Sequence, residues 1–203
     1  MTIFKKDDYG KVPLNAEICA LIEPGKKVLD VGCGPGKLGV ALKLKHCFSV
    51  GIEADKDLAE IARANYDELI VSDLEEFDGL AYAHGYFDVI VFADILEHLS
   101  EPEKTLSMFR SYLAPEGYIL VCMPNVANWQ VRINLLFGRF DYSPGILDGG
   151  HLRFFTQKSA MALIERAGYR VDWIGSRNRV IKLLGKLYKK LFAFQFIIKA
   201  SKK

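Results

Sequence analysis

The residues of this chain that are best suited to chemistry stand at the ends of short apolar runs. Asp30 ends the first run, and a glycine-rich turn follows it, formed by Gly32, Cys33, Gly34, Pro35 and Gly36. Glycine allows positive φ and a close approach of the backbone to a ligand. Lys37 stands where the phosphate-binding fingerprint G-x-G-x-x-G needs its third glycine. Because Asp30 would also repel a phosphate, the turn indicates an uncharged or cationic ligand.

Two more acidic residues follow the next apolar runs. Glu53 comes 21 residues after Gly32, where a carboxylate can accept hydrogen bonds from both hydroxyls of a ribose. Asp73 follows the third run and can accept from the exocyclic amine of an adenine, while Leu74 covers the ring. At the ends of consecutive strands, these residues together predict an adenosine site.

A second cluster contains Asp94, Glu97 and His98, whose spacing of i, i+3 and i+4 predicts one helical face. With His151 as a further ligand, the cluster could hold Mg²⁺, Mn²⁺ or Zn²⁺. If there is no metal, His98 or His151 is the natural general base, and Arg153 could bind a carboxylate or phosphate of the substrate. Local hydrogen bonds for the histidines and a surface salt bridge for Arg153 are the simpler alternatives.

The elements that must position these residues alternate along the chain. Near-continuous apolar runs predict strands at 28–31, 48–52, 68–71, 87–92 and 118–122, and helical patterns cover 38–44, 55–64 and 101–113. This order predicts a doubly wound α/β fold whose parallel sheet is covered on both faces. Beyond Pro124 we expect helices at 126–137, 156–167 and 180–192, a loop at 138–150, and strands at 169–174 and 194–198.

Several of these segments resemble one known family. LDVGCGPG, GIEAD, SDLEEF and FDVIVFADILEHL are similar to the class I S-adenosylmethionine-dependent methyltransferases. PNV, GILDGGHLRFFT and LFAFQFIIKA point to its small-molecule branch, which includes methionine-biosynthesis-W-like proteins and ubiquinone-pathway O-methyltransferases. The resemblance covers nearly the whole chain and implies a seven-stranded, mostly parallel sheet whose last strand is antiparallel.

The resemblance also implies a cofactor, S-adenosylmethionine, and roles for single residues. Asp30 and the glycines would lie near its methionine part, Glu53 at the ribose, and Asp73 with Leu74 at the adenine. The carbonyl of Ala93 is a further candidate contact to the methionine amine. In similar families with a Glu-x-x-Glu-His segment, a divalent metal binds the hydroxyl oxygens of the substrate, but this chain has Asp94 in place of the first Glu.

Length, cysteine spacing and charge limit the remaining possibilities. The 203 residues predict a single methyltransferase domain, 1–203, with an acceptor-site lid at 125–155 and a basic C-terminal helix and last strand at 176–203. From Trp173 onward there are nine Lys and Arg and no acidic residue, whereas the first 172 residues hold 18 basic and 25 acidic ones. Nucleic acid is therefore a poor partner, and the basic helix either contacts anionic lipid or keeps an apolar segment soluble. Four scattered cysteines without a C-x-x-C pair, and no apolar run long enough to span a bilayer, predict a cytoplasmic location.

The expected reaction is methyl transfer to a small molecule, with a hydroxyl as the acceptor. The aromatic and basic residues of the lid suit a sugar, a phenol or an anionic metabolite; they are Trp129, Arg132, Phe137, Arg139, Phe140 and Tyr142. An NAD(P)-dependent oxidoreductase is the alternative enzyme, although the missing third glycine, Asp30 and Asp73 disfavour it. A non-catalytic, methyltransferase-like regulatory subunit is the alternative from another class.

Overall fold

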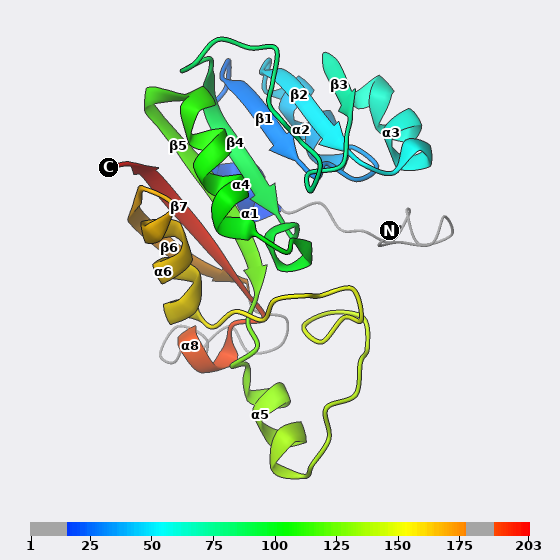
Figure 1. Cartoon of the computed structure of the whole chain (residues 1–203), viewed down its shortest axis with the longest axis vertical. Coiled ribbons are helices and arrows are strands. Elements are labelled where there is room, and N and C mark those ends of the chain that lie inside the picture. Colours follow the sequence, from blue (N-terminus) through cyan, green and yellow to red (C-terminus); the bar gives the residue numbers. More distant parts are fainter. Residues whose placement is uncertain (1–15, 178–188) are drawn as a thin grey trace.

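The computed structural model describes residues 16–177 and 189–203 and is built around one seven-stranded sheet. Its strands are β1 (Lys27–Val31), β2 (Phe48–Glu53), β3 (Glu68–Val71), β4 (Phe87–Ala93), β5 (Leu113–Pro124), β6 (Tyr169–Arg177) and β7 (Gln195–Lys202). They are arranged in the order β3-β2-β1-β4-β5-β7-β6 (Figure 1). The first five are parallel, and β7 is antiparallel to both of its neighbours. The predicted doubly wound sheet with an antiparallel last strand is confirmed.

Helices cover both faces of this sheet. They are α1 (Ala16–Leu21), α2 (Lys37–Leu44), α3 (Lys56–Ala62), α4 (Pro102–Phe109), α5 (Trp129–Leu136), α6 (Gln157–Arg166) and α8 (Lys189–Phe192), with single 3₁₀ turns at Arg63–Asn65, Leu96–His98 and Arg110–Tyr112. Apolar side chains of α4 and α6 pack in one buried cluster, and those of α1, α2 and α3 pack in another. Figure 1 shows α4 and α6 on the near side of the sheet, whereas α5 projects away from it.

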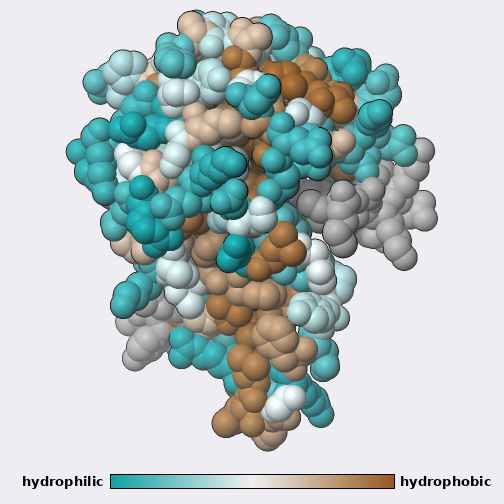
Figure 2. All heavy atoms as spheres, in the orientation of Figure 1, coloured by the Kyte–Doolittle hydropathy of each residue, from teal (hydrophilic) through white to brown (hydrophobic). Residues whose placement is uncertain are grey.

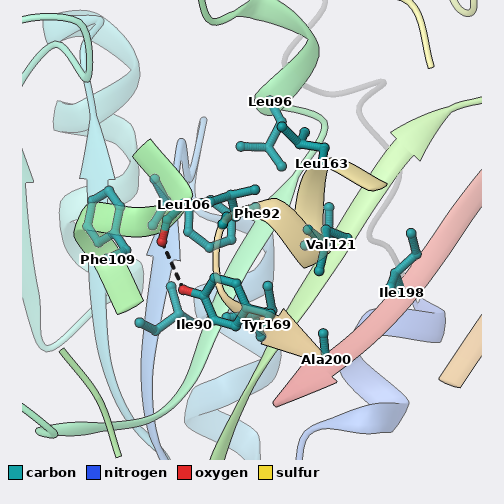
Figure 3. Close-up of a cluster of buried hydrophobic side chains, with 14 of the residues drawn as sticks. Ile90, Phe92, Leu96, Leu106, Phe109, Val121, Leu163, Tyr169, Ile198 and Ala200 are labelled. Atoms are coloured by element: carbon teal, nitrogen blue, oxygen red, sulfur yellow. Dashed lines mark hydrogen bonds between the residues drawn. The ribbon is translucent and has the colours of Figure 1, made fainter. Parts of the chain in front are cut away.

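The two clusters follow from the alternation of side chains along each strand. In β4, for example, Ile90 and Phe92 belong to the cluster with α4 and α6, whereas Val89 and Val91 belong to the other. A strand buried on both faces therefore reads as a continuous apolar run. Figure 3 shows the first cluster, in which the buried Tyr169 donates its hydroxyl hydrogen bond to the carbonyl of Leu106 at 2.9 Å.

The strand order places an open crevice where it is needed for a ligand. β1 pairs with both β2 and β4. The chain builds the sheet outward from β1 through β2 and β3, and then returns to the other side of β1 and continues through β4 and β5, so the strand order reverses at β1. Ligands bind at such a switch point, outside the carboxyl ends of the strands. The acidic residues singled out in the sequence stand at this edge.

Local contacts explain where the elements differ from the predicted ranges. The helix expected at 101–113 ends at Phe109, and Leu113 instead pairs with Phe87 as the start of β5. The helix expected at 126–137 begins at Trp129, since the Asn128 side chain accepts from the Gln130 amide at 2.9 Å and caps it.

The end of the chain also differs from its predicted ranges. The last strand is longer than expected and runs to Lys202. Most of the basic helix expected at 180–192 lies outside the described residues, which include only its final turn, α8. Among the helices described, none has the length and apolarity needed to cross a bilayer.

Candidate functional site

A cavity of about 860 Å³ opens at the carboxyl ends of β1 to β4. Every residue that the sequence assigned to the cofactor lines it, with the exception of Gly36: these are Asp30, Gly32, Cys33, Gly34, Glu53, Asp73, Leu74 and Ala93. Its far wall comes from the turn after β4 and from residues between Asp148 and Leu152. With Ile18 of α1, the structure thus brings together residues from six separate segments of the chain.

The glycine turn approaches the cavity through backbone shapes that other residues rarely adopt. Gly32 has a φ of 74°, and a Cβ there would lie 2.7 Å from the side chain of Ile95. Gly34 has a φ of 53°, and no atom lies within 4 Å of the position that a Cβ would take, so a ligand can approach the backbone closely there. Gly36 lies behind the cavity as the N-cap residue of α2. The turn therefore shapes the cavity floor without adding side-chain bulk.

Asp30 is 4% exposed and accepts a hydrogen bond from the hydroxyl of Tyr66. Burial raises the pKa of the Asp30 carboxyl from its ordinary 3.8 to about 7, the hydrogen bond from Tyr66 opposes this rise, and the nearby charge of Glu53 adds to it. A cationic ligand beside Asp30 would favour the ionised form. The cavity is therefore electrostatically suited to a positive group at this position.

Two backbone amides hold the Glu53 carboxylate. One oxygen accepts from the Gly34 amide at 2.8 Å and the other from the Asp55 amide at 2.9 Å. A carboxylate has about four acceptor sites, so both oxygens can still accept from ligand hydroxyls. At the end of β3, an oxygen of Asp73 accepts from the Glu75 amide at 3.0 Å, and Leu74 packs on the core. These positions match a ribose and an adenine side by side.

Asp94 does not share a helical face with Glu97 and His98. Asp94 has a φ of 56°, and only a single 3₁₀ turn, Leu96–His98, follows it, so this prediction is wrong. Its side chain lies in the cavity wall and accepts from the amide of Gln195 at 2.6 Å. A residue with this left-handed φ cannot be part of a right-handed helix, so Asp94 lies outside the turn that contains Glu97 and His98.

Glu97, His98 and His151 do come together. Within the described residues, their potential ligand atoms lie within 4.8 Å of one another, and this group does not include Asp94. Glu97 is 1% exposed, and neither of its carboxylate oxygens has a hydrogen-bond partner. Burial, and then the charge of Asp94, raise the pKa of Glu97 well above its ordinary value. An unpartnered buried carboxylate beside two imidazoles fits a divalent cation.

The histidine hydrogen bonds determine which ring nitrogens are available. His98 Nδ1 lies 2.9 Å from the carbonyl oxygen of Gly150, and His151 Nδ1 lies 3.1 Å from that of Ile146. Because a carbonyl can only accept, both Nδ1 atoms carry the proton. Burial lowers the pKa of both histidines, which favours neutral rings with a lone pair on each Nε2. A metal ligand and a general base both require this arrangement.

The structure places Arg153 and the first half of the expected lid away from the cavity. The Arg153 guanidinium donates to the carbonyl of Ser100 at 2.6 Å, and Arg153 does not line the cavity, so its contact with a substrate stays a prediction. Asp148, Gly150 and Leu152 line the cavity, whereas the segment 129–142 does not. Phe137 and Tyr142 are instead exposed, at 73% and 64%.

Sequence reasoning missed three residues that shape the site. Tyr66 precedes β3 and gives no sign in the sequence that it reaches Asp30. Gln195 begins β7 and is joined to Asp94 across the sheet. Asp148 accepts from the Gly150 amide at 2.9 Å and so orders the loop beside His98. For Asp148, the sequence LDGG at 147–150 predicts a loop, but it does not predict which group the Asp148 side chain binds.

Comparison with known proteins decides the family. A family model described as a methyltransferase domain matches residues 11–173. The chain belongs to this family. Membership favours the predicted methyltransferase function over that of an NAD(P)-dependent oxidoreductase, because the matched region contains the glycine turn, Glu53 and Asp73.

Curated relatives of this methyltransferase domain act in one pathway. A ubiquinone biosynthesis O-methyltransferase from Shewanella sp. is 28% identical over 149 residues, covering 70% of this chain and 62% of the relative. One from Psychrobacter arcticus is 30% identical over 163 residues, covering 74% and 62%. The chain thus spans somewhat under two thirds of the length of these relatives.

Solved structures agree in fold. A SAM-dependent methyltransferase from Archaeoglobus fulgidus has a TM-score of 0.69 at 20% identity, covering 96% of this chain and 92% of that one. A possible histamine N-methyltransferase from Thermotoga maritima has a TM-score of 0.66 at 19% identity, covering 92% and 86%. At such identities the likeness concerns the fold alone.

Replacing Asp30 with asparagine is expected to stabilise this methyltransferase domain above neutral pH. The folded pKa of about 7 exceeds the ordinary 3.8, so the favourable contribution of neutral Asp30 is complete below 3.8 and is lost as pH rises through 7. Urea unfolding of D30N and wild type should agree near pH 4 and differ by on the order of 2–4 kcal/mol at pH 8. The exposed Asp141→Asn is the control, and a D30N difference independent of pH would contradict the assignment.

Proposed function

We propose that this methyltransferase domain transfers the methyl group of S-adenosylmethionine to a hydroxyl oxygen of a small molecule. The observation that carries the proposal is the row of acidic groups along one cavity, with buried Asp30, amide-held Glu53 and Asp73 at successive strand ends. Two curated relatives are O-methyltransferases by name, which supports oxygen as the acceptor atom. A sugar, a phenol or an anionic metabolite fits the proposal.

S-adenosylmethionine supplies an electrophilic methyl carbon on a positively charged sulfur. The chain's part is mainly to bind and align, because positioning can supply much of the rate of a displacement. Glu53 accepts from the ribose hydroxyls, Asp73 accepts from the adenine amine, and the Ala93 carbonyl accepts from the methionine amine. Asp30 faces the positive charge, and the far wall of the cavity excludes water.

The Glu97–His98–His151 group removes the acceptor proton in one of two ways. Neutral His98, which lines the cavity, can take the proton on Nε2 as a general base. Alternatively, Glu97, His98 and His151 would hold a divalent cation, whose chemistry there would be to lower the pKa of the acceptor hydroxyl. We favour the cation, because it accounts for the buried Glu97 carboxylate, whose oxygens otherwise have no partner.

Cofactor binding tests the first part of the proposal. Calorimetry should detect S-adenosylmethionine and S-adenosylhomocysteine binding to wild type, and Glu53→Gln should weaken it about tenfold or more, since hydrogen bonds to a charged group contribute about 1.5–3 kcal/mol. The exposed Glu116→Gln should bind as wild type does. Binding of NAD in place of both compounds would instead indicate an oxidoreductase, and binding without methyl transfer to any hydroxyl probe would indicate a regulatory subunit.

Metal binding tests the second part. Titration with Mn²⁺ or Zn²⁺ should give one site per chain, lost in Glu97→Gln and His151→Asn because each removes a ligand. The exposed His84→Asn is the matched control, and Asp94→Asn should keep the site because Asp94 lies outside the group of three. No binding by wild type would leave His98 as the base and rule out the cation.

Peripheral contact with anionic lipid completes the proposal. The basic helix that we expected to make this contact lies mostly outside the described residues, and among those that are described α5 offers a suitable surface. Leu136 and Phe137, at the end of α5, are 80% and 73% exposed, and Figure 2 shows an apolar projection where Figure 1 places α5. Exposed Arg132 and Arg139 flank them, and no acidic residue occurs from 124 to 140. Apolar side chains framed by arginines are typical of a membrane-surface contact.

Vesicle flotation tests this contact. Wild type should bind phosphatidylglycerol-containing vesicles better than neutral phosphatidylcholine vesicles. Leu136→Ser should lower binding roughly tenfold, because it removes a leucine side chain that would be buried in the bilayer. Leu44→Ser on α2 is matched, since Leu44 is also 80% exposed. Equal losses in the two variants, or self-association abolished by Leu136→Ser without lipid binding, would contradict a lipid partner.

A further inference from the structure

Ser100 joins two loops that both contribute residues to the lining of the cavity. Its amide donates to one oxygen of Glu75 at 2.7 Å, and its hydroxyl donates to the other at 2.5 Å. Glu75 belongs to the loop after β3, which also carries Asp73 and Leu74. The turn that ends at Ser100 is therefore fixed to the adenine side of the cavity.

The same turn is fixed to the acceptor side by several bonds. The carbonyl of Ser100 accepts from Arg153 at 2.6 Å, and the carbonyl of Glu97 accepts from the amides of Leu152 and Arg153 at 2.9 and 3.0 Å. His98, within this turn, donates to Gly150. The chain Glu75–Ser100–Arg153 therefore runs from the adenine loop, past the candidate base, to the acceptor loop.

These contacts suit a linkage between binding sites better than a stabilising role. Glu75, Ser100 and Arg153 are all exposed, and exposed polar contacts add little to the free energy of unfolding. These hydrogen bonds, however, connect the loop that contains Glu75 to the loop that contains Arg153. When one loop becomes more ordered, the contacts available to the other loop change. A contiguous set of contacts can carry coupling between two sites when a ligand orders one end of it.

We propose that Ser100 is a positioning residue, through which cofactor binding at the adenine loop orders the acceptor loop 148–153 and fixes His98. This inference rests on the proposed cofactor function and adds an order of events to it, with the cofactor binding first and the acceptor second. Arg153 acts in the same chain, which explains why an arginine from the acceptor loop points at a backbone carbonyl rather than into the cavity.

Hydrogen–deuterium exchange with S-adenosylhomocysteine as the probe tests the linkage without a known acceptor. In wild type the ligand should slow amide exchange at both 72–76 and 148–153. In Glu75→Ala and Arg153→Ala, protection of 72–76 should remain, whereas protection of 148–153 should fall by about fivefold or more, the lower end of typical coupling between sites. Ser100→Ala should act in the same direction, and Ser100→Thr, which keeps a hydroxyl, should restore the protection.

The controls separate this role from a general loss of structure. Glu76→Ala and Lys158→Ala change exposed neighbours outside the chain and should behave as wild type, and all variants should keep wild-type melting temperatures without ligand. Undiminished protection of 148–153 in Glu75→Ala and Arg153→Ala would overturn the linkage alone. Absence of protection at 72–76 in wild type would overturn the cofactor site, and the linkage with it.

Discussion

The cavity depends on one buried acidic group, the carboxylate of Asp30 at the end of β1. Its burial raises its pKa to about 7, so the folded chain holds an ionised group there at a cost in stability. Tyr66 offsets part of this cost through its hydroxyl. A ligand with positive charge would offset more, and the methionine part of S-adenosylmethionine carries two positive groups. The glycine turn and the crevice at the switch point make room for such a ligand beside Asp30.

A second buried carboxyl group belongs to Glu97, next to His98 in the cavity wall, and burial raises its pKa as it does that of Asp30. Its oxygens have no hydrogen-bond partner, and potential ligand atoms of two histidines lie within 4.8 Å of it and of one another. Each site therefore holds a buried carboxyl group whose ionised form a cation would stabilise, one on the donor side and one on the acceptor side. The turn from Glu97 to Ser100 forms part of the wall between them and is bonded to both flanking loops.

The sequence predicted those features that depend on local pattern. Apolar runs gave the strands, and the acids that follow them gave the cofactor side, because parallel strands bring their carboxyl ends to one edge. The acceptor side depends on tertiary contacts, and there prediction was less complete. A helical spacing placed Asp94 with Glu97, but the left-handed backbone of Asp94 prevented that helix. No sequence pattern showed that Gln195 would reach Asp94 across β5 or that Arg153 would bind a carbonyl.

A crystal structure with S-adenosylhomocysteine would test the central claim most directly. The account predicts the nucleoside in the 860 Å³ cavity, its ribose hydroxyls within hydrogen-bond distance of Glu53, its adenine beside Asp73 and Leu74, and its amino group near Asp30. An empty cavity at saturating ligand, or a nucleoside bound elsewhere with Glu53 still satisfied only by its two backbone amides, would contradict it.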